Sequence, residues 1–535
     1  MKHTLAFPFE PARSALLSRA LAVLAVLALA ACGESGEPGT ASQAQTEPQA
    51  VAPAMVPQTP PRPVPEPAPQ MPAVLSEDGQ RPLLEDMARS YPAIEQLRHK
   101  EETGEVRALR LAREAEEFAA NLERARVDLY GIKQNLARLS QGGPPTYALL
   151  HFIGTNGRLR AWLVSPDGGV VMGATDDPYA GMGELQAGLG VERIAETRGP
   201  QLKSQEKPRL DADEDAERGA PGKRDNSPEA IRKRQETLAD AAQTLLPGDT
   251  RQVLAAGQGR LLIVPVRDTG TAPYAALPIR SHDDFAARRW SFVVMQDLDV
   301  LAGSKSSVDM GRIDFSKSVI VGDPTDMRDV RYTFPALPGA RAEAKAIAEK
   351  FGVDPQHVFI GADATRKNVL RAIERSDGQG VIFLATHGVA DPKNPLTRGF
   401  VVLSQQNLFA GELRYHKFEG WEQRPPLVVM SACQSAMGRV LEGGTFGVAR
   451  TWTNAGAGQV VASLWNVSDK ATYLLMTRFA TQLQKGLAPE LAMQAAQLET
   501  VRDYPDDPKM WASFTIIGKP ANVNGPVEQR QALTP

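Results

Sequence analysis

A histidine and a cysteine each follow a short apolar run in the second half of the chain. Residues 381–386 lead into His387, and residues 427–432 lead into Cys433. Runs rich in β-branched residues are typical of strands buried on both faces of a parallel sheet. In open α/β sheets, the carboxyl ends of the strands carry the site. Because a thiol nucleophile needs a base close in space, the pair predicts a cysteine hydrolase with a His–Cys dyad.

The sequence around these two runs alternates between strand and helix patterns. Strands are predicted at 260–265, 318–324, 357–360, 381–386, 427–432 and 459–465, and helices at 341–351, 366–376, 444–453, 469–483 and 489–501. This alternation indicates βαβ units, and therefore an α/β fold with a mostly parallel sheet flanked by helices. A β-meander is predicted before it, because Asn156-Gly157 and Asp167-Gly168 are strong turn signals between apolar runs.

Composition excludes several classes of protein. The 535 residues carry a net charge of −3, so bulk charge gives no sign of nucleic acid binding. Cys32 and Cys433 are the only cysteines, which excludes a disulfide scaffold and a cysteine-rich metal module. The predicted chemistry needs neither a metal nor a cofactor.

The first 31 residues are predicted to be a bacterial lipoprotein signal peptide. Their apolar run, 20–31, is too short to span a bilayer. Residues 29–33 (LAACG) resemble a lipobox, in which the chain is cut before the cysteine and that cysteine is acylated. This resemblance predicts lipidation at Cys32 and a lipid-anchored envelope protein, on the outer membrane and facing the periplasm. The alternative is an ordinary secretory signal, in which Cys32 is incidental.

Three further segments lie outside the predicted sheet. Residues 32–75 are rich in proline and are predicted to form an extended tether. Residues 76–142 are predicted to be helical, and apolar positions within 107–139 repeat at spacings of three and four. That seam indicates either self-association or, as the favoured interpretation, packing within the chain. Residues 200–228 are highly charged and predict a solvated insertion, with a regulatory cleavage site as the less favoured interpretation.

Several motifs, taken in order, resemble a CHAT domain, the caspase-like peptidase domain often found beside tetratricopeptide repeats. They are LLIVPVRDTGTAPYAALP at 261–278, LATHG at 384–388, DPKNPLTRGFVVLS at 391–404, SACQSA at 431–436, GGTFGVART at 443–451, GAGQVVASLWNVSD at 456–469 and MWASFTIIG at 510–518. The resemblance assigns 143–520 to this domain and leaves 521–535 as a tail. The tetratricopeptide array expected beside it is not visible.

The resemblance implies a caspase/separase-like fold in which His387 is the base and Cys433 the nucleophile. It also implies an oxyanion site that uses the N–H of Gly388 together with that of the nucleophile. Related separases hold a substrate arginine with an acidic residue near Asp469. Here that residue is interpreted first as a helix cap, with Ser468 as a competitor for this role. Trp465 is interpreted equally as a pocket wall or as core. Ser435 is predicted to begin a helix.

These observations predict a membrane-anchored envelope endopeptidase that cleaves protein or peptide substrates, made either active or as a zymogen. The alternative is a non-catalytic or conditionally activated scaffold with the same fold. An exposed single thiol is easily oxidised in the periplasm, which favours the alternative, whereas the intact dyad favours the enzyme.

Overall fold

The computed structural model of the chain describes residues 130–153, 157–191, 201–202, 226–296, 298–303, 307–308, 313–416, 418–441 and 444–522. The predicted signal peptide, Cys32, the tether and most of the helical segment lie outside these residues. So do most of the charged insertion and almost all of the predicted tail.

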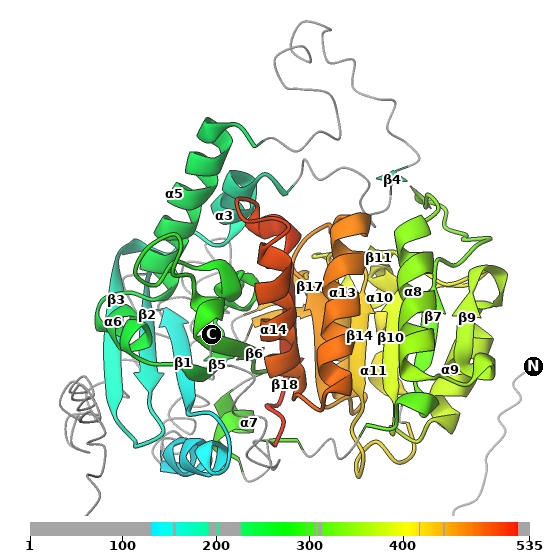
Figure 1. Cartoon of the computed structure of the whole chain (residues 1–535), viewed down its shortest axis with the longest axis horizontal. Coiled ribbons are helices and arrows are strands. Elements are labelled where there is room, and N and C mark those ends of the chain that lie inside the picture. Colours follow the sequence, from blue (N-terminus) through cyan, green and yellow to red (C-terminus); the bar gives the residue numbers. More distant parts are fainter. Residues whose placement is uncertain are drawn as a thin grey trace, which may run out of the picture. The chain divides into compact units, whose positions relative to one another are not determined.

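An eleven-stranded sheet forms the centre of the described part (Figure 1). Its strands, in spatial order, are β3 (Val170–Pro178), β2 (Arg158–Val164), β1 (Thr146–Ile153), β5 (Gly259–Val264), β6 (Trp290–Val294), β18 (Phe514–Gly518), β17 (Gln459–Ser463), β14 (Leu427–Ser431), β10 (Val381–Ala385), β7 (Val319–Gly322) and β9 (Val358–Ile360). The predicted fold class, with a β-meander before a mostly parallel sheet, is confirmed. β10, β14 and β17 are buried along their whole lengths, as their apolar sequences predict.

Strand direction reverses once in the middle of this sheet. β18 pairs antiparallel with β17 and parallel with β6. The strands from β17 to β9 are parallel to one another, and β6, β5 and β1 are parallel to one another. The sheet therefore contains two parallel runs that point in opposite directions.

Helices cover both faces of the sheet. They are α3 (Gly183–Leu189), α5 (Pro228–Leu245), α6 (Asp249–Ala256), α7 (Leu298–Ala302), α8 (Pro338–Phe351), α9 (Arg366–Arg375), α10 (Pro395–Arg398), α11 (Ala410–Tyr415), α12 (Val448–Asn454), α13 (Asp469–Gln484) and α14 (Pro489–Val501). Figure 1 shows α8, α13 and α14 side by side over one face. Right-handed crossovers place α9, α11 and α12 on the other, because these helices connect strands in the opposite direction along the sheet.

Several of these helices begin at the capping residues that the sequence predicts. The Ser227 hydroxyl accepts from the N–H of Ala230 at the start of α5, and Pro228 is its first residue. The Thr365 hydroxyl accepts from the N–H of Asn368 in the same way at α9. None of the helices in the described part is both long and apolar enough to cross a membrane.

The last part of the predicted helical seam packs on the body of the chain. Residues 130–140 are helical, and Ile132, Leu136 and Leu139 are buried in the main core. Asn135 Nδ2 donates to the carbonyl of Leu301 at 2.9 Å. For these residues the structure therefore supports packing within the chain. The rest of 107–139, and with it the prediction of self-association, lies outside the described residues.

Two predictions after the cysteine are wrong. Residues 444–453 were expected to form one helix, but Gly444–Gly447 is a strand, β16, that pairs with β15 (Gly438–Leu441), and only α12 is helical. Threonine and phenylalanine in GTFG fit a strand, and glycine disfavours a helix, so pairing with β15 prevails here. Ser435 begins no helix, because the chain turns directly into this hairpin.

A small three-stranded sheet lies next to β10. It consists of β11 (Gly388–Val389), β12 (Phe400–Val401) and β13 (Leu408–Phe409). Val389, Phe400 and Val402 form a separate apolar cluster, against which Tyr332 and Phe334 pack. The segment between β7 and α8 is thereby held beside the chain that follows β10.

Candidate active site

The two predicted reactive residues lie at corresponding positions on neighbouring strands. β10 and β14 are parallel, and Ala385 is paired with Ser431 at their carboxyl ends. His387 and Cys433 each come two residues after that pair. Both side chains have zero exposure. The sheet thus brings the imidazole and the thiol to one edge, as the sequence predicts, but in a closed site.

A backbone carbonyl fixes one nitrogen of the His387 ring. Nε2 lies 2.7 Å from the carbonyl oxygen of Pro335, in the segment before α8. A carbonyl can only accept a hydrogen bond, so Nε2 carries the hydrogen. In the neutral ring, Nδ1 then has the lone pair and is the nitrogen that can act as a base. The Phe334 ring, with its centroid 5.2 Å from that of His387, packs against the imidazole.

The sulfur of Cys433 lies against the main chain just before α13. The N–H of Val467 points to Sγ with an N-to-S distance of 3.2 Å. A hydrogen bond donated to sulfur favours the thiolate over the thiol. Val467 directly precedes Ser468, the N-cap of α13, so the positive end of that helix also faces this region.

Gly388 permits the close approach of the two strand ends. A Cβ atom at this position would lie 2.6 Å from the carbonyl oxygen of Cys433, which is too close for any side chain. The N–H of Val402 donates to the carbonyl of His387 at 3.0 Å, so His387 and Val402 form a hydrogen-bonded pair. Because such pairs alternate along an antiparallel ladder, the Gly388–Val401 pair is of the other kind. The N–H of Gly388 therefore points away from β12.

The turn after the cysteine is held by two serines. The N–H of Ser435 donates to the Ser463 hydroxyl, and the N–H of Ser463 donates to the Ser435 hydroxyl at 2.7 Å. Gln434 has a φ of 52°, a left-handed conformation that non-glycine residues rarely adopt. Sequence reasoning missed Ser463, Pro335 and Val467. The last two act through backbone atoms, for which residue type gives no signal.

The two predicted pocket residues are both buried. Trp465 donates from Nε1 to the carbonyl of Lys509, and its own carbonyl accepts from the N–H of Gln434. Asp469 is not the helix cap, because the Ser468 hydroxyl accepts from the N–H of Ala471 and has taken that role. The Asp469 carboxylate instead accepts from the N–H of Gly339 at 2.6 Å and joins the starts of α13 and α8.

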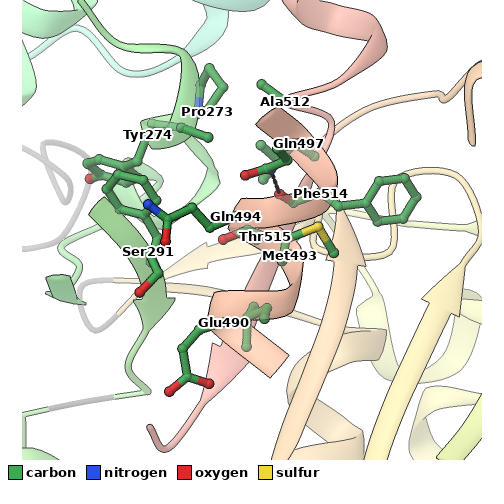
Figure 2. Close-up of a pocket in the computed structure, with 15 residues that line it drawn as sticks. Pro273, Tyr274, Ser291, Glu490, Met493, Gln494, Gln497, Ala512, Phe514 and Thr515 are labelled. Atoms are coloured by element: carbon green, nitrogen blue, oxygen red, sulfur yellow. Dashed lines mark hydrogen bonds between the residues drawn. The ribbon is translucent and has the colours of Figure 1, made fainter. Parts of the chain in front are cut away.

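A small cavity lies elsewhere, between α14, β6 and β18. Figure 2 shows Ser291, Glu490 and Gln494 around it, and Gln497 donating to the carbonyl of Phe514. Neither His387 nor Cys433 lines this cavity. Within the described residues, no group of three or more histidine, cysteine, aspartate or glutamate side chains could hold a metal ion.

A family model matches the part of the chain that contains this site. The model is that of the CHAT domain, and it matches residues 235–519, more than half of the chain. The chain belongs to the CHAT domain family. The matched residues lie inside the predicted range 143–520 and contain β10, β14, His387 and Cys433.

Relatives of this CHAT domain occur in much longer proteins. The chain is 25% identical over 331 residues to tetratricopeptide repeat protein 28 of Mus musculus, and the match covers 54% of this chain and 13% of that protein. Among solved structures, it is similar to the Saccharomyces cerevisiae separase–securin complex, with a TM-score of 0.49, 10% identity and coverage of 84% of this chain and 34% of that one. It is also similar to the Arg-specific cysteine proteinase gingipain R, with a TM-score of 0.31, 11% identity and coverage of 55% and 68%.

Proposed function

We propose that this chain is a cysteine endopeptidase in which His387 and Cys433 form the catalytic dyad. One observation carries the proposal: the two residues follow paired positions on neighbouring parallel strands of a CHAT domain. An imidazole and a thiol at the same sheet edge are the minimum for thiol-based acyl transfer.

In the proposed reaction, Nδ1 of His387 takes the proton of the Cys433 thiol. The thiolate attacks the carbonyl carbon of a peptide bond and forms a tetrahedral intermediate. When this intermediate collapses, the protonated His387 gives its proton to the leaving amine, and an acyl-thioester remains on Cys433. Water, deprotonated by His387, then hydrolyses the thioester and regenerates the thiol. A positioned histidine typically contributes ~10²–10⁴ in rate to such steps.

The oxyanion of the intermediate is proposed to lie against the N–H groups of Gly388 and Cys433. Two features support this role for Gly388: its N–H points away from β12, and its missing Cβ lets it touch the Cys433 main chain. One donor of this kind is worth about 3 kcal/mol in comparable sites.

The site as described is closed, so the proposed enzyme is a zymogen that must open. Cys433 and His387 are fully buried, and the sulfur is held by the N–H of Val467. A substrate carbonyl has to reach the sulfur within contact distance. Because the N–H of Val467 meets the sulfur directly, the main chain around Val467 must move before a peptide binds.

Asp469 and Trp465 remain proposed pocket residues. Asp469 lies two residues after Val467, whose N–H meets the sulfur of the proposed nucleophile. In the closed site this carboxylate accepts a hydrogen bond from the N–H of Gly339. A substrate with a basic side chain before the scissile bond would replace that N–H, whereas a substrate with an apolar side chain would leave it in place.

The proposed setting is the bacterial envelope, with the chain anchored through an acylated Cys32 in the outer membrane and facing the periplasm. The lipobox-like residues 29–33 support it. Envelope or secreted proteins would then be the substrates. Mass measurement of the mature amino-terminal peptide tests the anchor. An acylated Cys32 is the expected result, and an unmodified peptide that begins elsewhere would contradict it.

Peptide cleavage is the first test of the enzyme. The full chain in detergent and its Cys433→Ala variant are incubated under reducing conditions with a mixed peptide library, before and after limited proteolysis to open the site. We expect cleavage by the wild type alone, and the cleaved peptides give the residue before the scissile bond. Equal cleavage by both proteins would show that the dyad assignment is wrong.

A non-catalytic scaffold is the second candidate, and the full burial of both reactive side chains favours it. A peptide carrying a thiol-reactive electrophile separates the two. The enzyme predicts labelling of Cys433 that depends on His387. A scaffold predicts that labelling requires denaturant and is the same in His387→Gln.

A further inference from the structure

We propose that Asp323 is a positioning residue for the dyad: its carboxylate holds the segment 334–337, whose Pro335 carbonyl orients the His387 ring. The inference rests on the proposed function and deepens it. Asp323 does not contact the substrate or the reacting atoms and acts through the main chain.

Asp323 is tied to the strand that leads to His387. It follows β7 directly, is 3% exposed and has a φ of 40°. Its N–H donates to the carbonyl of Ala385 at 3.0 Å, which extends the β7–β10 pairing to two residues before His387. Aspartate tolerates the left-handed conformation better than most residues do. The backbone of Asp323 therefore has a fixed position relative to β10.

The carboxylate of Asp323 holds the start of α8. Oδ1 accepts from the N–H of Leu337 at 2.8 Å, and Oδ2 accepts from Nε of Arg341 at 2.8 Å. Leu337 is the N-cap residue of α8, and its own side chain makes no capping hydrogen bond. Hydrogen bonds to an ionised acceptor are about twice as strong as neutral ones. The Asp323 carboxylate thus joins the end of the segment 334–337 to the first turns of α8.

The segment is stiff enough to carry this restraint to His387. Pro335 and Pro338 have φ locked near −65°, and Leu337 is restricted because a proline follows it. Only one residue separates Leu337 from Pro335. The Pro335 carbonyl, 2.7 Å from Nε2 of His387, is therefore placed by the contact two residues away.

Loss of this restraint has a specific chemical consequence. When the Pro335 carbonyl accepts from Nε2, the neutral ring is held as the Nε2–H tautomer, and Nδ1 stays basic. A displaced carbonyl leaves the ring to populate the Nδ1–H tautomer, in which the nitrogen needed for catalysis already carries a hydrogen. Asp323 would thus control the fraction of rings in the competent form.

The test compares Asp323→Gly and Asp323→Asn in the full chain. Glycine removes the carboxylate and accepts a φ of 40° without strain. Asparagine keeps an acceptor for the N–H of Leu337 but loses the charge and the pairing with Arg341. Long-range ¹H–¹⁵N correlation spectra of histidine-labelled protein report the tautomer, and the His387→Gln spectrum assigns the signal.

We expect the Nε2–H tautomer in the wild type, a partial shift to Nδ1–H in Asp323→Asn and a larger shift in Asp323→Gly. The same order is expected for kcat on a cleaved peptide, with a fall of about 10- to 100-fold in Asp323→Gly and KM within about twofold. If Asp323→Gly does not fold, the asparagine variant decides alone. A wild-type tautomer in every variant that folds would overturn the proposal.

Asp268 supplies a matched control. Its carboxylate also accepts from a backbone N–H, that of Met182 at 3.0 Å, and from the hydroxyl of Tyr179 at 2.7 Å. We expect Asp268→Asn to leave the His387 tautomer unchanged. Because the tautomer is read without substrate, the role of Asp323 stays open to measurement even when the wild type cleaves no peptide, and the two proposals fail separately.

Discussion

The two parallel runs of the sheet each carry a buried histidine, one just past the end of a strand and the other within a strand. The two histidines differ in the residues that they can meet. His387 follows the end of β10, and His151 lies within β1. Each ring nitrogen Nε2 lies within hydrogen-bond distance of a carbonyl, 2.7 Å from Pro335 for His387 and 2.8 Å from Leu245 for His151. The other nitrogen of His151 faces the hydroxyl of Tyr274.

The two histidines share burial and a carbonyl partner, so these features by themselves assign catalysis to neither. A residue within a strand has neighbours on the adjacent strands and packs among them. A residue just past a strand end instead meets the residue at the same place on the next parallel strand. For His387 that residue is Cys433. His151, within its strand, instead meets the hydroxyl of Tyr274.

The first prediction concerns the replacement of each of the two histidines in turn. We expect His387→Gln to lower kcat by ~10²–10⁴, because it removes the proposed general base. We expect His151→Gln to change kcat less than threefold, because its ring touches no reacting group. Steady-state cleavage of one peptide by both variants is the measurement. A large loss of kcat in His151→Gln would mean that the second run also takes part in catalysis.

The second prediction concerns pH. Desolvation by burial lowers the pKa of His151 from 6.5 to about 4, against the opposing effect of its hydrogen bond to Leu245. The unfolded chain then binds the proton more tightly than the folded one. Stability contributed by the neutral ring is complete above pH 6.5 and is lost as pH falls from about 6.5 to about 4. The loss amounts to about 3 kcal/mol at most.

Urea unfolding at pH 7.5, 6 and 5 measures this loss, and His151→Gln isolates it from other titrating groups. We expect the wild type to lose more stability than the variant over this range. Parallel curves for the two proteins would show that His151 is protonated in the folded state near its ordinary pKa.

The third prediction concerns the contact between the two strand ends. Gly388→Ala places a Cβ against the Cys433 carbonyl, and we expect a stability loss of about 1–3 kcal/mol and a fall in kcat of about 100-fold. Gly183→Ala at the start of α3 is the control, since no atom lies within 4 Å of its Cβ. Thermal unfolding and peptide cleavage are measured together. Unchanged stability and kcat in Gly388→Ala would show that the two strand ends accept a Cβ without moving apart.

The smallest predicted effect distinguishes two helix caps. Ser468→Ala and Ser227→Ala each remove a side-chain acceptor for a backbone N–H, and each should cost about 1 kcal/mol of stability. Only Ser468 adjoins Val467, whose N–H meets the sulfur of Cys433. We therefore expect the rate of Cys433 alkylation to change in Ser468→Ala alone. An equal change of the alkylation rate in both variants would mean that access to the Cys433 thiol depends on the overall stability of the fold and not on the cap of α13.

The sequence by itself determined most of the strands and helices around the candidate site of this CHAT domain, and it predicted His387 and Cys433 as the dyad. Apolar runs predicted the buried strands, and Ser227 and Thr365 marked the starts of two helices. The alternation of strand and helix predicted parallel pairing of the strands. These signals are local, since hydrophobic period, capping and strand ends depend on residues a few positions apart. His387 and Cys433 followed from them, because parallel neighbours end at the same edge.

The tertiary structure decided how those residues are held. In the folded chain Ser468, and not Asp469, caps α13. The Asp469 carboxylate instead accepts from the N–H of Gly339, more than a hundred residues away in the chain. The tertiary structure also assigned the Pro335 carbonyl to His387 and the Val467 N–H to Cys433. Backbone donors and acceptors are the same in nearly every residue, so only their positions in space determine which of them orient the dyad and close the site.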